Sequence, residues 1–307
     1  MVKFIVIHRK DQNNVGDIAS NPLQYFLREE QYQVIDIAEL GRDSYPSGVP
    51  IIVGGGGLIA NETMSQALDR IFVESDRLQL ESLWEQRWAL GNPDNKDLHK
   101  NFTEEYRSLI KKYIDKIPKS KSKKFMWGAG HNASVKKDKS GRVSGIEYPS
   151  SMLNYDLIGI RDYGTDYNWV PCASCMHPAL RKSYAIKNDI IWFEHKKQLI
   201  KDFGNESIPR FVNSGSNIEQ TIELLGSANI ILTNSYHGAY WGTLLKKKVI
   251  LVDAWSSKFF LFKHNPYFID RATDFRSILD QVSIHTDALD DCINANNIYW
   301  QRIKDQT

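Results

Sequence analysis

Two separate series of short apolar segments, each followed by a polar turn and an amphipathic stretch, run along this chain. The first series opens with the apolar run 2–7, and the stretch 18–27 after it has the periodicity of an amphipathic helix. Further strands are expected at 33–37, 50–53, 125–127 and 156–160. The order strand, helix, strand predicts a β-α-β unit, which builds a parallel sheet.

The alternation starts again near Asn188. Strands are expected at 190–193, 211–212, 228–233 and 249–253, with helices at 218–225, after His237 and over the tail 277–304. Such a restart indicates a second α/β lobe rather than one long sheet. We therefore predict an α/β fold with two Rossmann-like lobes, at 1–183 and 184–285. The C-terminal helix within 286–307 is expected to pack back on the first lobe.

Composition excludes some classes of protein. The 307 residues carry a formal net charge of only +2, whereas nucleic-acid-binding domains usually have a strongly basic face, so we expect no nucleic-acid partner. No apolar run approaches the roughly 20 residues of a membrane span, and the start of the chain resembles a strand more than a signal segment. The three cysteines cannot all pair, and a chain of this size needs no disulfides. A cytoplasmic location is expected.

Two segments of the first lobe have more than one interpretation. The irregular, polar stretch 84–101 predicts a functional loop or lid, and Trp88 within it is a candidate stacking surface for a sugar, with packing in a core as the alternative. The basic run 119–124 predicts either a solvated loop or a peripheral contact with lipid phosphate at the inner face of the membrane.

Four consecutive glycines, Gly54, Gly55, Gly56 and Gly57, follow the strand at 50–53 and precede a helix expected at 61–83. Ligands of open parallel sheets bind at such strand ends, where a backbone without Cβ atoms can approach them and a following helix offers N–H groups to an anion. The run matches neither the P-loop nor the dinucleotide fingerprint. It is a candidate anion site, with a tight turn as the alternative.

A second candidate lies after the first strand, where Asn14 and Asp17 occupy the turn into the first helix. As one interpretation, Asp17 caps that helix by accepting backbone N–H groups. In the other, its carboxylate faces the cleft as a base for an acceptor hydroxyl.

The third candidate is the turn Ser235, Tyr236, His237 and Gly238, between the strand at 228–233 and a helix. A histidine at this turn faces the ligand side of the sheet near a helix N-terminus. There its imidazole is suited to donate a proton or to contact a phosphate.

Two further basic residues follow strands. Arg161 ends the strand at 156–160, and Lys258 follows the strand at 249–253. A guanidinium at this edge can hold a carboxylate or phosphate by two hydrogen bonds. The alternatives are a local salt bridge for Arg161 and an exposed side chain for Lys258.

Cys172, Cys175 and His177 are closely spaced, as metal ligands often are. No second pair completes a zinc site, and Cys292 is remote in sequence. We therefore expect the cysteines to be buried small residues, and no metal.

In combination, these motifs resemble those of the polysaccharide pyruvyl transferases. Asn-x-Gly-Asp at 14–17, the glycine run, Arg161 with Asp162, and Ser-x-His-Gly at 235–238 occur in that family's order, and the resemblance extends from about Asn13 to Lys258. It implies a GT-B-like fold, in which two lobes face each other across a cleft. It also implies transfer of the enolpyruvyl unit of phosphoenolpyruvate to two hydroxyls of a glycan as a cyclic ketal, with release of phosphate.

The resemblance also implies roles for residues. Arg161, His237 and Lys258 would hold the donor's carboxylate and phosphate, beside the glycine run and the turn 235–238. Asp17 would face the acceptor. Asn14, Trp88 and Trp255 are expected on the acceptor side, and no metal or cofactor is required. The acceptor would be a surface polysaccharide or its lipid-linked precursor.

One position departs from the family. Some members carry arginine immediately before the histidine, where this chain has Tyr236. With one cation fewer, the phosphate would depend more on Arg161 and Lys258, or the donor would differ. A nucleotide-sugar glycosyltransferase and a non-catalytic glycan-binding protein are the alternatives, since a fold does not fix a function.

Overall fold

A computed structural model describes nine stretches of the chain: 2–10, 13–36, 48–59, 122–133, 136–137, 143–144, 146–196, 198–200 and 208–307. The helix expected at 61–83, the loop 84–101 with Trp88, and residues 119–121 of the basic run lie outside these residues. Lys124, at the end of that run, is buried and opens a strand, so the solvated interpretation is wrong for this residue.

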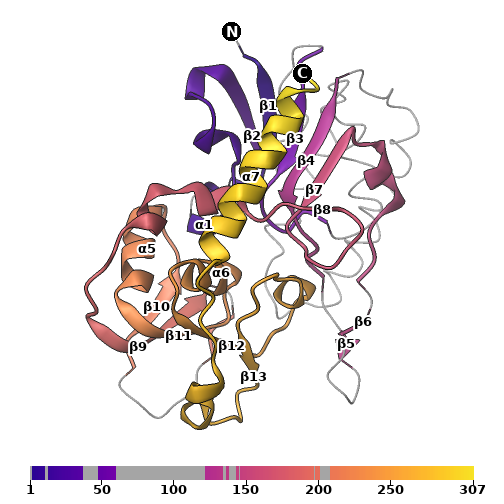
Figure 1. The fold of residues 1–307 in the computed structure, drawn as a ribbon. Helices are drawn as coiled ribbons and strands as arrows, with labels where there is room; N and C mark the ends of the chain where they lie inside the picture. The colour runs from indigo at the N-terminus through magenta and orange to yellow at the C-terminus, as the bar shows by residue number, and fades with distance from the viewer. Residues whose placement is uncertain are drawn as a thin grey trace.

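The first lobe is built on a six-stranded parallel sheet (Figure 1). Its strands are β1 (Phe4–His8), β2 (Tyr32–Asp36), β3 (Ile51–Gly54), β4 (Lys124–Ala129), β7 (Leu157–Ile160) and β8 (Asn168–Trp169), in the order β2-β1-β3-β4-β7-β8. Every residue of β1, β3 and β4 is buried, which explains why these strands are continuous apolar runs in the sequence. A separate antiparallel pair is formed by β5 (Lys136–Lys137) and β6 (Val143–Ser144).

The helix expected at 18–27 is wrong. The chain instead forms the short helix α1 (Val15–Ala19), then 3₁₀ turns at Leu23–Tyr25 and Glu29–Gln31. Pro22 has no N–H to continue the helix, and the side chain of Asn21 accepts a hydrogen bond from the Leu23 N–H, which favours a turn. The side-chain amide of Gln24 donates a hydrogen bond to the Ile18 carbonyl at 3.1 Å.

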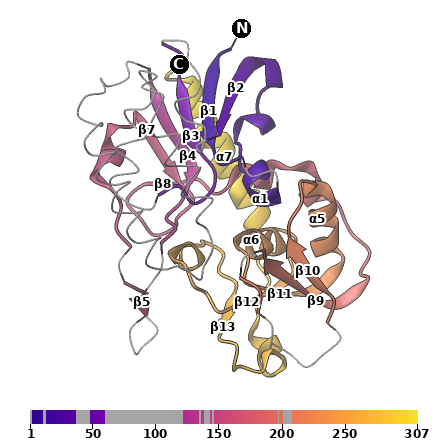
Figure 2. The ribbon, with the colours of Figure 1, turned by 180° about the vertical axis from the view of Figure 1, so that it is seen from behind.

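The second lobe contains a five-stranded parallel sheet in the order β10-β9-β11-β12-β13 (Figure 2). Its strands and helices are β9 (Asn188–His195), β10 (Arg210–Asn213), α5 (Ile218–Gly226), β11 (Ala228–Thr233), α6 (Tyr236–Leu244), β12 (Lys248–Val252) and β13 (Tyr267–Ile269). All nine residues of α6 are buried, because this helix lies in the main hydrophobic cluster and not on the surface. Two parallel sheets confirm the α/β fold with two Rossmann-like lobes.

The C-terminal tail is not one helix from 277 to 304. A 3₁₀ segment at Phe275–Gln281 precedes the helix α7 (Ala288–Lys304), and Figure 1 shows α7 leading from the second lobe onto the first. The Tyr299 hydroxyl donates to the Met126 carbonyl at 2.5 Å, and Asn296 accepts from the Trp127 indole at 2.7 Å. The expectation that this helix packs back on the first lobe is confirmed.

Candidate active site

Both sheets have the same strand order, so each has one point where the chain reverses its direction of winding. That point lies between β1 and β3 in the first lobe and between β9 and β11 in the second. Ligands of open α/β sheets bind beyond the carboxyl ends of the strands at such points. The two edges meet, since the Lys196 ammonium after β9 donates to the Asn13 carbonyl after β1 at 3.2 Å. Any site here would be shared between the lobes.

His237 and Gly16 are in close contact where these edges meet. His237 is only 6% exposed in the first turn of α6, and a Cβ atom on Gly16 of α1 would lie 1.9 Å from its Nδ1 atom. Position 16 therefore has to be glycine for the imidazole to occupy this place. The ring also contacts Trp241, at 4.9 Å between centroids, and its Nε2 atom lies 3.8 Å from the Cys172 sulfur.

The basic groups chosen from the sequence influence one another electrostatically. Burial, followed by the charges of Arg161 and Lys258, lowers the pKa of His237 well below its ordinary value. Burial and Arg161 also lower the pKa of Lys258 to about 7, while the carboxylate of Asp17 opposes this shift. The structure thus brings together Arg161, His237, Lys258 and Asp17 from four different segments.

Arg161 is held by aromatic stacking. It is 4% exposed, and its guanidinium carbon lies 4.0 Å from the ring centre of Tyr236. Phe262 stacks on Tyr236 at 4.7 Å. The Nε atom of Arg161 is buried without a hydrogen-bond partner among the described residues. Tyr236 therefore supports the guanidinium of Arg161.

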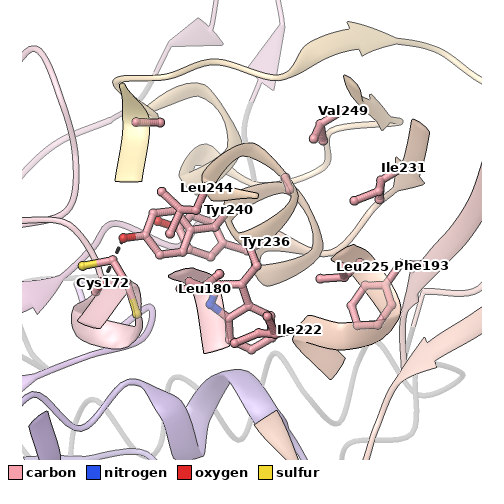
Figure 3. Close-up of a cluster of buried hydrophobic side chains, with 14 of the residues drawn as sticks. Cys172, Leu180, Phe193, Ile222, Leu225, Ile231, Tyr236, Tyr240, Leu244 and Val249 are labelled. Carbon is pink, nitrogen blue, oxygen red and sulfur yellow. Dashed lines mark hydrogen bonds between the residues drawn. The ribbon is translucent and has the colours of Figure 1, made fainter. Parts of the chain in front are cut away.

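Figure 3 shows the neighbouring wall of the site, where Tyr240 reaches from α6 to Cys172. The Tyr240 hydroxyl donates to the Cys172 carbonyl at 2.8 Å. A cavity of about 20 Å³, enough for one water molecule, is lined there by Arg161, Tyr236 and Cys292, among others. All three cysteines are free and buried, as expected. Within the described ranges, no three His, Cys, Asp or Glu side chains are grouped for metal binding.

The loop after β12 is tied to the loop after β4. The Ser257 hydroxyl bonds the His131 Nδ1 atom at 2.7 Å, and the Ser256 hydroxyl donates to the Asn132 side chain at 2.8 Å. Lys258 follows directly and lies 4.5 Å from the Trp255 ring centre. This connection between the lobes was not predicted from the sequence. The pair Ser256-Ser257 beside Lys258 was the available signal.

Asp162 completes the wall beside Arg161. Its carboxylate accepts from the His131 N–H at 2.7 Å and from the Tyr148 hydroxyl at 2.9 Å. Burial nevertheless raises the pKa of Asp162 to about 6, against the charge of Arg161 and these hydrogen bonds.

The glycine run fits tightly against the protein. A Cβ atom on Gly55 would lie 2.3 Å from the Ser20 carbonyl oxygen, and those on Gly54 and Gly57 would meet Trp127 and Asn132. Gly55 and Gly56 both have a φ of +77°. These features agree with the tight-turn alternative. Around Gly56 a Cβ atom would meet no described atom within 4 Å, so Gly56 is the member of the run with room for a ligand.

The remaining candidates have structural partners. Asn14, and not Asp17, is the N-cap of α1, because its side chain accepts from the Gly16 N–H at 3.1 Å. Ser235 precedes α6 and bonds the Asn213 side chain at 3.1 Å. Gly238 lets α6 approach β11, since a Cβ there would lie 2.4 Å from the Thr233 hydroxyl. The capping interpretation of Asp17 is wrong, because Asn14 is the residue that caps the helix.

Comparisons with known proteins leave the function open. No protein-family model matches the chain, and no curated protein matches it. One similar solved structure is that of a functionally uncharacterized protein from Klebsiella pneumoniae subsp. pneumoniae NTUH-K2044. It is 12% identical, with 82% of this chain and 83% of that chain covered, at a TM-score of 0.38. A likeness of this degree assigns no function. Within the described part of the chain, no helix combines the length and hydropathy of a membrane span.

Proposed function

We propose that this chain is a ketal-forming pyruvyl transferase, which moves the enolpyruvyl unit of phosphoenolpyruvate onto two hydroxyls of a glycan or its lipid-linked precursor. The observation that carries the proposal is that Arg161 and His237 are buried, Lys258 is half-buried, and the charges of Arg161 and Lys258 act on His237. Buried positive charge is unfavourable unless it is paired. A donor with a carboxylate and a phosphate would place negative charges beside these basic groups.

In the proposed reaction, binding of phosphoenolpyruvate changes the pKa of His237, so that this residue can act as the acid. Before binding, burial and two nearby cations hold the pKa of His237 low, so its imidazole is neutral. The negative charges of phosphoenolpyruvate offset those cations and raise the pKa of His237. The imidazolium can then protonate the methylene carbon C3 of the donor, which leaves a cationic centre at C2.

The first glycan hydroxyl then bonds to C2 and releases its proton to Asp17. The bond between C2 and the phosphate oxygen breaks, and Arg161 and Lys258 stabilise the departing phosphate. The second hydroxyl attacks C2 and closes the ketal, and its proton returns to His237. Asp17 passes the first hydroxyl proton to the departing phosphate, the second hydroxyl proton restores the acid on His237, and C3 keeps the proton that His237 donated.

The test is phosphate release from phosphoenolpyruvate in the presence of a panel of oligosaccharides and lipid-linked sugars. We expect Arg161→Ala and His237→Gln to reduce turnover about 10²-fold or more, by analogy with the loss of one group that stabilises charge in a transition state. Arg302→Ala, an exposed arginine on α7, is the matched control and should retain activity.

Turnover of nucleotide sugars alone would replace the proposal with a glycosyltransferase. Full activity of His237→Gln would remove histidine as the acid. Binding of glycans without turnover of either donor would indicate a non-catalytic glycan-binding protein.

A further inference from the structure

Two polar atoms at the carboxyl edge of the second sheet are buried and lack hydrogen-bond partners among the described residues. They are the amide oxygen Oδ1 of Asn213 and the indole Nε1 of Trp255. Asn213 is 5% exposed, and its amide nitrogen donates to the Ser235 hydroxyl at 3.1 Å. Proteins satisfy nearly all buried polar atoms, so two such atoms at one edge indicate a ligand or ordered water.

His195 lies near both Asn213 and Trp255. It pairs with Asn213 across β9 and β10, and its ring centre lies 5.6 Å from that of Trp255. Its backbone N–H donates to the Asn234 side chain at 2.7 Å, which fixes the end of β9 against the turn after β11. Asn213 therefore lies beside His195 on the neighbouring strand, and the Trp255 ring packs against the His195 ring, so both residues lie near the end of β9.

The hydrogen-bonding character of these two atoms indicates which kind of ligand they could bind. Asn213 offers an acceptor and Trp255 a donor, both uncharged, and a sugar hydroxyl can partner either one. The Lys258 ammonium lies 4.5 Å from the centre of the Trp255 ring. That contact also places the edge directly beside the basic cluster.

We propose that the edge from Asn213 to Trp255 binds the acceptor saccharide. Asn213 Oδ1 accepts a hydrogen bond from one sugar hydroxyl, and Trp255 Nε1 donates one to another. This assignment rests on the proposed function, in which the donor's phosphate and carboxylate occupy the neighbouring cluster of Arg161, His237 and Lys258.

The test compares Asn213→Ala and Trp255→Phe with the wild type. Phenylalanine keeps an aromatic ring beside Lys258 and removes only the N–H donor. Each variant should raise the KM for the glycan acceptor about 3- to 10-fold, the value of one hydrogen bond, with the KM for phosphoenolpyruvate unchanged. Asn229→Ala is the control, since Asn229 is exposed at the opposite edge of the same sheet and bonds Asp189.

Binding measurements test the saccharide site without relying on turnover of phosphoenolpyruvate. Free disaccharides of glucose, galactose, mannose and N-acetylglucosamine are titrated calorimetrically into the wild type and both variants, with uridine diphosphate as the competing probe. Weaker disaccharide binding by both variants supports the site even when phosphoenolpyruvate is not turned over. An unchanged acceptor KM and unchanged disaccharide binding overturn it. Binding of uridine diphosphate that depends on Asn213 and Trp255 also overturns it, in favour of a nucleotide.

Discussion

Asp162 makes the stability of the fold depend on pH in a way that can be calculated. Burial raises its pKa from 3.8 to about 6. Below pH 3.8 the carboxyl is protonated in both folded and unfolded chains. Between these two values the unfolded chain loses its proton first, so stability falls as pH rises through the folded pKa. At about 1.4 kcal/mol per pH unit, the full effect is about 3 kcal/mol.

Asp162→Asn isolates this effect, because the amide oxygen can still accept from the His131 N–H. Urea unfolding followed by tryptophan fluorescence gives the free energy of unfolding of both proteins from pH 4.5 to 7.5. We expect the wild type to lose about 2 kcal/mol relative to the variant over this range. A difference between the two proteins that stays constant with pH would refute the reasoning, since Asp162 would then titrate alike in both states.

Three further perturbations probe the site and the contact between lobes. Gly16→Ala inserts a Cβ atom 1.9 Å from the His237 Nδ1 atom, so we expect a loss of about 1–3 kcal/mol in thermal unfolding and a displaced imidazole with little phosphate release. Because the pKa of Lys258 is about 7, sulfate should bind about tenfold more weakly at pH 8 than at pH 6, whereas calorimetry on Lys258→Arg should show little change. Tyr299→Phe removes hydrogen bonds to Met126 and Leu157, and urea unfolding should show a loss of about 1–3 kcal/mol, with normal stability counting against the role of α7.

The strands were predictable from the sequence where both of their faces are buried, because such a strand is a continuous run of apolar residues. The segment 228–233 was expected as a strand and is β11 with the same bounds. The two-residue strand β8 was missed because Asn168 and Trp169 carry no such pattern. The helix at 18–27 failed because Pro22 and Asn21 favour a turn locally, and this overrides the apolar periodicity.

The site was predictable to the extent that its residues follow strands. Arg161, His237 and Lys258 were found in this way, because parallel strands deliver their carboxyl ends to one edge. His131, Ser257 and Asn213 were missed, since their roles depend on partners more than 20 residues away or in the other lobe. No local pattern encodes such contacts. The role of Gly16 depends on the contact between α1 and α6, which no local sequence pattern encodes.

The position of the site also explains why α7 returns to the first lobe. Arg161 belongs to the first lobe, while His237 and Lys258 belong to the second, so their charges are close only when the lobes are docked. That arrangement is electrostatically unfavourable without an anion, and contacts elsewhere have to hold it. The helix α7 follows the second sheet in sequence, but its Asn296 and Tyr299 side chains form hydrogen bonds with the first sheet. The helix therefore stabilises the docking of the two lobes that brings these charges together.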